Sequence, residues 1–405
     1  MKYLLIVGDG MADYPVPELG NKTPLQAANK PNMDTIAAKG RNGLLRTVPE
    51  GLNPGSGPAI ISVIGYDPAR YYTGRGPFEA AARNIRLNEN DVAYRCNLIT
   101  EKDGILVDYS ADHITSSEAE KLIDALKSEI KKPDEVEFFA GLDYRHFLIL
   151  RNYLHREIIE CTPPHDAIGT EISKILPRAN SRETKSTVDL LSGLILDSKK
   201  VLENHPVNTA RIRAGKRAGN MIWPWGGGRK PSLPTFKQKY GVDAAVISAV
   251  DLVKGIGVYA GMKVVDVPGA TGLYDTNYEG KAEYALKALE NSDMVFVHVE
   301  APDEAGHSRD YKLKVKTIED LDKRLLGNIL DGMKEDCAIA VLPDHPTPIK
   351  IGTHTRDPVP FAIYNPSAEA DGVKKFDEFS AKKGGFGLIE GEEFMLSFLG
   401  KTSGK

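Results

Sequence analysis

The chain has 405 residues, of which 41% are hydrophobic and 27% are charged, and its formal net charge is −4. This composition is typical of a globular protein with a sizeable core, divided into two or three domains at about 100–200 residues each. The weak negative charge excludes a general electrostatic attraction to phosphate backbones, so we expect no nucleic-acid partner.

The first predicted element is a buried strand at residues 3–7, which ends just before Asp9. The opening run MKYLLIV is too short for a signal-peptide core and far short of the ~20 apolar residues of a membrane helix, so we expect no membrane anchor. Gly8 and Gly10 flank Asp9 and permit close approach of the backbone to a ligand. Asp-Gly is also a common turn pair, so turn chemistry alone could explain Asp9.

A helix is predicted to begin after Thr23, the expected N-cap, with Pro24 at its first position. Ser56 follows in NPGSGPAIISVIGYDP, where Pro and Gly predict a sharp turn and the apolar run predicts a helix or a buried strand. A serine at a helix start near two cations could lose its proton and attack phosphorus. Taken alone, Ser56 fits an ordinary N-cap better than a nucleophile, and the chain has no GxSxG elbow.

The middle of the chain has a different character, with charged stretches such as SEIKKPDEVEFF and the loop WPWGGGRKPSLPTF. We interpret residues 79–235 as an inserted α+β domain that binds substrate, and residues 1–78 and 236–405 as one discontinuous domain. Three scattered cysteines without CxxC spacing give little support to a disulfide framework or a zinc knuckle, so we expect a cytoplasmic protein.

The C-terminal half alternates between strands and helices. A helix is predicted over 244–254, and strands, helices and ligand loops then alternate as strand 263–267, helix 281–290, strand 294–299, helix 312–332 and strand 338–342. This order is typical of βαβ units and predicts a mostly parallel sheet flanked by helices, which is an α/β fold.

Metal-ligand residues follow two of these strands. Asp303 and His307 stand four apart, which on a helical turn puts them roughly 5–6 Å apart and within reach of one cation. Asp344 and His345, as neighbours on an extended backbone, could face two different ions, and His354 follows nearby. Carboxyl ends of parallel strands meet at one sheet edge, so these side chains are expected to converge with Asp9. The alternative for the first pair is a helix cap and a solvated histidine.

The chain resembles the cofactor-independent phosphoglycerate mutases of archaeal type, which belong to the alkaline phosphatase superfamily. The resemblance covers nearly the whole chain and rests on Asp9, Ser56, Asp303-x3-His307, Asp344-His345 and His354, together with GYDP at 65–68, TGRGPFEAA at 73–81, NMIWPWGGG, PGATGLYDTNYEGKAE, EAPDEAGH and THTRDPVPF.

The resemblance implies an alkaline-phosphatase-like fold and the interconversion of 3-phosphoglycerate and 2-phosphoglycerate through a phosphoserine, without 2,3-bisphosphoglycerate. Ser56 would be the nucleophile. The family's two metal sites would be formed here by the following residues: Asp303, His307 and His354 for one ion, and Asp9, Ser56, Asp344 and His345 for the other. The ions are usually manganese in this family, with magnesium or zinc as alternatives, since ligand type alone does not choose among them.

Arginine forks suit the phosphate and carboxylate of such a substrate. The residues expected to bind it are Arg75, Arg95, Arg145 and Arg211, with Lys254 and His113 as further phosphate-binding or proton-handling groups. A surface salt bridge is the alternative for each of them.

The resemblance also leaves a second function open. MADYP, RCNL, PDHPTP and THTRDPVPF are similar to a branch of the family proposed to act as homoserine kinases, although no GxxxxGK[ST] motif is present. The chain departs from the family after the serine, where Gly57, Pro58 and Ile60 replace commonly acidic or polar residues. Loss of such polarity could alter the orientation of Ser56.

Overall fold

The computed structural model describes residues 1–153, 158–159, 161–179 and 181–401. The chain forms two compact units, which are Met1–Tyr72 with Ser232–Lys405 (unit 1) and Thr73–Pro231 (unit 2). The first limit predicted from the sequence, at residue 78, would cut helix α5 (Arg75–Ala82), which packs on β3 and β7 of unit 2. Both limits therefore lie earlier in the chain than predicted, at 72/73 instead of 78/79 and at 231/232 instead of 235/236. The substrate-binding role of the inserted unit stays a prediction.

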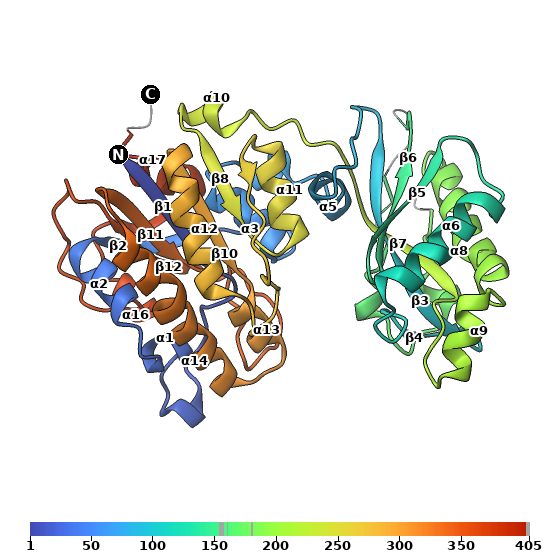
Figure 1. The fold of residues 1–405 in the computed structure, drawn as a ribbon, viewed down its shortest axis with the longest axis horizontal. Coiled ribbons are helices and arrows are strands. Elements are labelled where there is room, and N and C mark those ends of the chain that lie inside the picture. Colours follow the sequence, from blue (N-terminus) through green and yellow to red (C-terminus); the bar gives the residue numbers. More distant parts are fainter. Residues whose placement is uncertain (154–157, 160, 180, 402–405) are drawn as a thin grey trace. The chain divides into compact units, whose positions relative to one another are not determined.

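Unit 1 is built on one eight-stranded sheet with the order β13-β2-β12-β11-β1-β10-β8-β9 (Figure 1). Its central strands pair in parallel, whereas β12 runs antiparallel to both of its neighbours. The strands are β1 Lys2–Gly8, β2 Arg41–Arg46, β8 Ala244–Ile247, β9 Lys263–Val264, β10 Met294–Val299, β11 Cys337–Leu342, β12 Val359–Tyr364 and β13 Gly387–Glu390. The α/β class and the mostly parallel sheet predicted from the sequence are confirmed.

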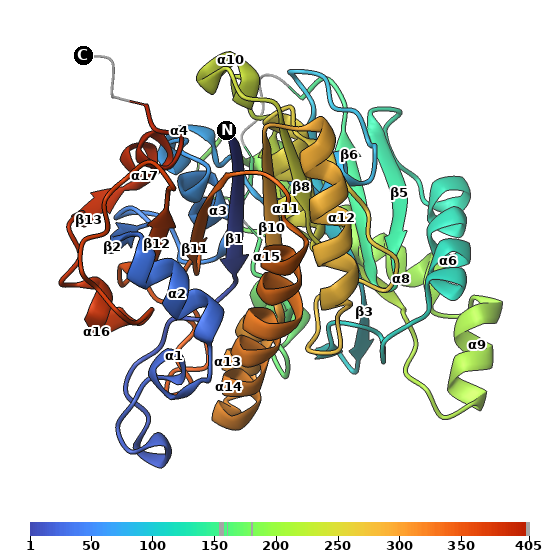
Figure 2. The same ribbon diagram turned by 60° about the vertical axis from the view of Figure 1, so that its left-hand side comes forward.

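Helices cover both faces of this sheet because its central strands are apolar on both sides. Leu4 and Ile6 of β1 pack in one core cluster with α2, α12 and α14, which Figure 2 shows on the near side of the strands. Helices α3, α11 and α17 pack with one another or with strands on the other face. The main helices are α2 Pro31–Lys39, α3 Ser56–Val63, α11 Asp251–Tyr259, α12 Tyr278–Asn291, α13 Ala301–His307, α14 Tyr311–Asp320 and α17 Gly391–Phe398.

Two predicted elements of this unit differ in the structure. Residues 244–254 do not form one helix, because Ala244–Ile247 is a fully buried strand that pairs with β10, and the helix α11 begins only at Asp251. The strand predicted at 263–267 is reduced to Lys263–Val264. The predicted helix 312–332 is present as α14, a π-helical turn at Leu321–Gly327 and α15 Asn328–Gly332.

Unit 2 is an antiparallel sheet with helices on it. Strand β3 pairs with β4, β6 and β7, and β5 pairs with β6. The long helices α6 and α8 share a core with alternate residues of β3, while α5 lies against the opposite side with Ala93 and Phe147. The elements are β3 Val92–Lys102, β4 Ile105–Asp108, β5 Val136–Leu142, β6 Arg145–Leu150, β7 Met221–Arg229, α5 Arg75–Ala82, α6 Ser116–Glu129, α8 Lys185–Leu202 and α9 Pro206–Arg213.

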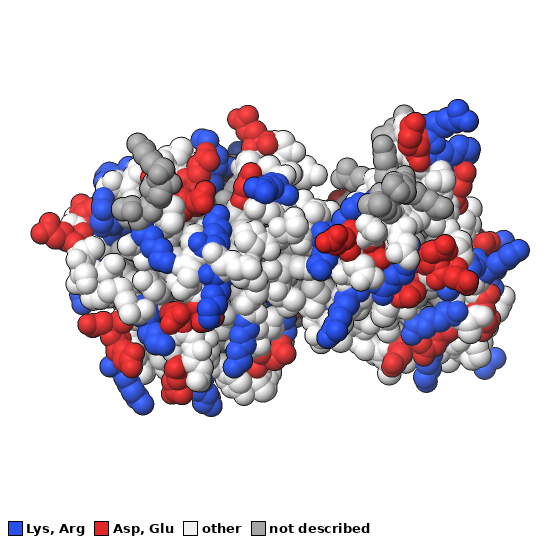
Figure 3. Space-filling view, turned by 90° about the horizontal axis from the view of Figure 1, so that it is seen from above, with Lys and Arg blue, Asp and Glu red and all other residues white. Residues whose placement is uncertain are grey.

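The surface carries both signs of charge. In the face shown in Figure 3, lysine and arginine side chains are interspersed with aspartate and glutamate over both units. Among the described residues, no helix is long and apolar enough to cross a membrane.

Candidate functional site

The carboxyl ends of three neighbouring strands meet in unit 1. Gly8 of β1 is in register with Val299 of β10, and Val7 with Leu342 of β11. The backbone N–H of Asp9 donates to the carbonyl of Val299 at 2.9 Å, so the loops that follow β1 and β10 begin side by side. Polar residues placed after these strands therefore converge at one edge of the sheet.

The first group of converging ligands comes from α13 and the loop after β11. Asp303 and His307 stand four apart on this helix, and Asp303 Oδ2 lies 3.1 Å from His307 Nε2. His354 Nε2 lies 2.9 Å from His307 Nε2 and 3.5 Å from Asp303 Oδ1. Asp303 thus directs one carboxylate oxygen to each imidazole, Oδ2 to His307 and Oδ1 to His354. Carboxylate and imidazole donors in such proximity are typical of divalent-cation sites.

The second group surrounds His345. Its Nε2 lies 3.4 Å from Asp9 Oδ1, 3.4 Å from Asp344 Oδ2 and 3.3 Å from Ser56 Oγ. Ser56 Oγ also donates to Asp9 Oδ2 at 3.2 Å. The structure therefore brings together residues that are up to 336 positions apart in the chain, from Asp9 to His345.

The two groups adjoin each other. The rings of His345 and His354 have centroids 4.2 Å apart, and Asp303, His345 and His354 offer ligand atoms within 4.8 Å of one another. The sequence predicted that Asp344 and His345 could face two different ions. Both lie with Asp9 in one set of ligand atoms, and His345 also borders the first group.

The residues present fit divalent cations. Asp9 Oδ1 and Asp344 Oδ2 are buried and accept no hydrogen bond from the described residues, which leaves two carboxylate oxygens directed into the site. Burial, together with the charges of Asp344, Glu300 and Asp303, raises the pKa of Asp9 well above its ordinary value. A cation would relieve this concentration of negative charge, and the carboxylate and imidazole donors suit manganese, magnesium or zinc.

Histidine and aspartate stabilise each other in the first group. A hydrogen bond with Asp303 is the main cause that raises the pKa of His307 to about 9. Burial opposes ionisation of Asp303, but bonds from His307 and His354 prevail and hold its pKa well below the ordinary value. A cation that binds here must displace the proton of His307, because only neutral imidazole is a ligand.

Ser56 lies at the first residue of α3, after Gly55 at φ 157° and ψ 168°. Gly57, which follows Ser56, has a local packing reason in this chain, because a Cβ on it would overlap the ring of Tyr72. Ile60 is fully buried in α3. The apolar residues after Ser56 are therefore explained by the packing of α3. The Ser56 hydroxyl is oriented by its contacts with Asp9 and His345.

Some residues of the site were not predicted. His298 Nε2 lies 2.9 Å from Asp9 Oδ2, and its Nδ1 lies 3.1 Å from Ser248 Oγ. Glu300 and Thr347 also border the ligands, through Asp9 and Asp303 respectively. The signal for His298 was present in the sequence, since a histidine inside the apolar strand VFVHV must find a buried polar partner.

Three of the predicted substrate-binding residues form a cluster in unit 2, which we call the arginine group: Arg75, Arg95 and Arg145. Arg95 and Arg75 both pair with the buried Glu79, and Arg95 Nε lies 3.1 Å from Glu79 Oε2. Burial lowers the pKa of Arg95 to about 10, aided by the positive charges of Arg75 and Arg145, so Arg95 is still charged at neutral pH. Glu79 is thus shared by Arg75 and Arg95, whereas Arg145 pairs with Asp143 at 3.6 Å, so three guanidinium groups face two carboxylates.

Aromatic rings border the arginine group. The guanidinium of Arg95 lies 4.6 Å from the ring centroid of Trp225, and that of Arg145 lies 5.0 Å from Tyr144. Side chains of Arg75 and Arg145 are 37% and 45% exposed, so both remain accessible to a ligand.

The other predicted substrate-binding residues lie elsewhere. The prediction that Arg211 binds substrate is corrected by the structure. Its side chain is only 1% exposed, pairs with Glu118 at 2.6 Å and donates to the carbonyl of Ala111. It holds a turn of unit 2 rather than a substrate. His113 is exposed in that turn, with φ 48°. Lys254 belongs to unit 1 and pairs with Asp266 at 2.5 Å.

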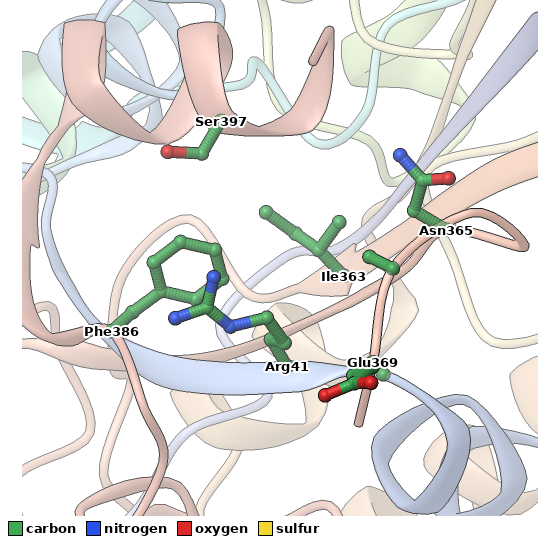
Figure 4. A pocket seen from close by; sticks show the side chains of 8 residues that line it. Arg41, Ile363, Asn365, Glu369, Phe386 and Ser397 are labelled. Atoms are coloured by element: carbon green, nitrogen blue, oxygen red, sulfur yellow. The ribbon is translucent and has the colours of Figure 1, made fainter. Parts of the chain in front are cut away.

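A small cavity of about 80 Å³ lies apart from these residues (Figure 4). It is in unit 1, and it is lined by Gly40, Arg41, Ile363, Asn365, Ala368, Glu369, Phe386 and Ser397. None of the ligand residues lines it, so the chemistry of unit 1 resides in the convergent ligands and not in this cavity.

Known proteins resemble the chain over its whole length. A family model described as 2,3-bisphosphoglycerate-independent phosphoglycerate mutase matches residues 37–208. A protein of that name from Methanosarcina acetivorans is 54% identical over 399 residues, which is 98% of each chain. A probable mutase of the same name from Geobacter sulfurreducens is 47% identical over 406 residues, covering 98% of this chain and all of the relative.

Solved structures share the fold. A protein from Pyrococcus horikoshii superposes with a TM-score of 0.84 at 32% identity, covering 100% of this chain and 98% of the other. The cofactor-independent phosphoglycerate mutase from Thermoplasma acidophilum gives a TM-score of 0.65 at 29% identity and covers 99% of both chains.

Proposed function

Because the chain belongs to the family of 2,3-bisphosphoglycerate-independent phosphoglycerate mutases, we propose that it interconverts 3-phosphoglycerate and 2-phosphoglycerate, with Ser56 as the residue that carries the phosphoryl group. The identity to the curated relatives confirms the family resemblance found in the sequence. A homoserine kinase activity is not proposed, since the relatives described above carry the mutase name.

The observation that carries this proposal is the placement of the Ser56 hydroxyl. Its Oγ lies 3.2 Å from Asp9 Oδ2 and 3.3 Å from His345 Nε2, among the ligand atoms of the second group. Ser56 is also at the N-terminus of α3, where the helix dipole favours the negative charge of a serine that has lost its proton. An ordinary N-cap serine would not be surrounded by convergent acids and imidazoles.

We assign one divalent cation to Asp303, His307 and His354, and another to Asp9, Ser56, Asp344 and His345. Manganese is the proposed ion, with magnesium and zinc as alternatives that the same donors accept. When bound, such ions stabilise charge on phosphoryl oxygens and lower the pKa of a neighbouring hydroxyl. The second ion is supported by the two unsatisfied oxygens of Asp9 and Asp344 and by the grouping of these residues with His345. The first is supported by the grouping of Asp303 with His354 and by the 3.1 Å contact of His307 with Asp303.

The residues of the chain define the course of the reaction. Ser56 Oγ forms a bond to phosphorus while the bond from phosphorus to the glycerate oxygen breaks, and the serine proton has an acceptor in Asp9 Oδ2. The other hydroxyl of glycerate then attacks the phosphoserine and restores the free Ser56. In each half one phosphorus–oxygen bond forms as another breaks, and the proton of the attacking hydroxyl passes to the released oxygen, so no further reactant is needed.

We propose that the arginine group of unit 2 binds anionic oxygens of the substrate. Arginine forks match phosphate and carboxylate groups, and the three arginines face two carboxylates, Glu79 and Asp143. His113 and Lys254 stay predictions. A reducing cytoplasm is also proposed, on the support of Cys96 and Cys337, which are buried and form no disulfide among the described residues.

The test is a comparison of the unaltered protein with Ser56→Ala in the presence of Mn²⁺ and 3-phosphoglycerate, without added bisphosphoglycerate. Loss of the nucleophile should lower turnover by at least about 1000-fold. Ser62→Ala is the matched control, because Ser62 is on the same helix but is packed near Gly391 of α17. Equal turnover of Ser56→Ala and Ser62→Ala would remove the covalent mechanism.

A further inference from the structure

Thr347 occupies the space between the two ligand groups. It lies three residues after Asp344, and its side chain is fully buried. Its hydroxyl donates a short hydrogen bond to Asp303 Oδ1 of the first group and lies 3.3 Å from His345 Nδ1 of the second. Thr347 is thus in contact with a ligand residue of each group without being a ligand itself.

The direction of these hydrogen bonds follows from the donors and acceptors available. An ionised carboxylate only accepts, so the single hydroxyl proton of Thr347 goes to Asp303. The hydroxyl oxygen can then only accept from His345, which requires the proton of the neutral ring to be on Nδ1. The other nitrogen, Nε2, is left with a free lone pair, and Nε2 is the atom that faces Asp9, Asp344 and Ser56.

We propose that Thr347 is a positioning residue that fixes His345 in the tautomer able to bind a cation and, through the same hydroxyl, orients Asp303. This inference rests on the two-cation site proposed above. Outer hydrogen bonds of this kind set the orientation and the basicity of metal ligands. One hydroxyl therefore couples the geometry of both ligand groups.

A buried lysine holds Thr347 in place. Lys314 of α14 is completely buried and donates to the carbonyl of Thr347 at 2.9 Å, to the carbonyl of Ala12 at 3.2 Å and to Asp13 Oδ2 at 2.7 Å. Asp13 in turn accepts from the backbone N–H of Ile349, two residues beyond Thr347. The loops after β1 and β11 are thereby tied to α14.

Close packing leaves Thr347 little freedom. A Cβ on Gly306 would lie 2.5 Å from the carbonyl oxygen of Thr347, and one on Gly10 would lie 2.7 Å from its hydroxyl oxygen. Both glycines let the backbone approach the threonine, Gly10 from the loop that carries Asp9 and Gly306 from the helix α13 that carries Asp303. The hydroxyl is consequently fixed from three sides before any ion binds.

The test measures Mn²⁺ binding to the substrate-free protein, by following free Mn²⁺ with electron paramagnetic resonance at constant pH. Thr347→Val keeps the shape of the side chain and removes the hydroxyl, so the affinity for Mn²⁺ should fall by about 10- to 100-fold. Thr347→Ser keeps the hydroxyl and should bind within about threefold of the unaltered protein. Thr347→Ala, which adds no atom, serves if the valine variant does not fold.

The outcomes separate this inference from the function on which it rests. If the unaltered protein binds Mn²⁺ and Thr347→Val or Thr347→Ala binds it equally well, the positioning role is wrong while the metal site stands. If Thr347→Ser loses affinity as much as the valine variant, the hydroxyl is not the cause and the inference is overturned. If the unaltered protein binds no Mn²⁺ to these ligands, both proposals fail.

Discussion

Glu378 makes the stability of unit 1 depend on pH in a way that one substitution should remove. This glutamate is half-buried and accepts from the backbone N–H of Asp13 at 3.0 Å and from the hydroxyl of Thr23 at 2.7 Å. Loss of solvation raises its pKa from 4.5 to about 7. The folded protein therefore holds this proton more tightly than the unfolded chain does.

The sign and size of the effect follow from these two pKa values. Stability from Glu378 is fully present below pH 4.5, is lost as the pH rises toward 7, and stays lost above it. A shift from 4.5 to about 7, at 1.36 kcal/mol per pKa unit, corresponds to about 3 kcal/mol. Glu378→Gln should abolish this loss, because an amide of the same shape carries no proton that titrates.

The assay is thermal unfolding between pH 5 and pH 8 in the presence of EDTA, so that cation binding does not contribute. For a unit of this size, about 3 kcal/mol corresponds to a Tm difference of about 6–12 °C. The fall in Tm from pH 5 to pH 8 should be smaller by this amount in Glu378→Gln than in the unaltered protein. Glu390→Gln is the control, because Glu390 is 75% exposed. Parallel Tm–pH curves for both variants and the unaltered protein would refute the reasoning.

Three further predictions concern single residues. Gly10→Ala should lower the affinity for Mn²⁺ by more than about tenfold, because its Cβ would lie 2.6 Å from a carboxylate oxygen of Asp303. Gly20→Ala is the control, since Gly20 has a similar φ of 68° but open space around it, and this variant should keep its affinity. Equal affinities of the two variants in a Mn²⁺ titration would contradict the prediction. Glu79→Gln should destabilise unit 2 by about 3–5 kcal/mol, since it leaves buried guanidinium charge unpaired, and an unchanged denaturant midpoint would argue against that burial. Arg145→Met should raise KM for 3-phosphoglycerate about tenfold or more through the loss of a charged hydrogen bond, while exposed Arg213→Met should not; identical KM values would exclude Arg145 from substrate binding.

The ligand residues could be predicted because their chemistry is local. Asp9, Asp344 and His345 each follow an apolar strand, and the rule that parallel strands end at one sheet edge brings them together. The structure places these residues together with Ser56, at distances of 3.2–3.4 Å. Assigning them to cations stays a proposal that binding experiments must test.

The roles of arginines could not be read from the sequence. Arg95 and Arg211 are both buried, and each has a carboxylate partner on another element of unit 2. Arg95 lies beside two other arginines, whereas Arg211 holds the carbonyls of a turn. Only tertiary contacts separate these two cases, because the same residue type in a mixed segment fits both.

The prediction of secondary structure was wrong where a short apolar run fitted both a strand and a helix. Ala244–Ile247 has no polar residue to reveal a period of two or of 3.6, so neither strand nor helix is favoured locally. Pairing with β10 decides the matter. Thr347 was missed for a similar reason, because a threonine in a Pro-rich loop carries no sign that its hydroxyl lies between two ligand residues.

The central claim is that Ser56 carries the phosphoryl group, and rapid chemical quench followed by peptide mass spectrometry tests it most directly. Protein mixed with Mn²⁺ and 3-phosphoglycerate labelled with ¹⁸O in the phosphate should yield a phosphopeptide that contains labelled phosphate on Ser56, appearing before labelled 2-phosphoglycerate accumulates. Formation of labelled 2-phosphoglycerate at an undiminished rate, with Ser56 unmodified at every quench time, would contradict the account.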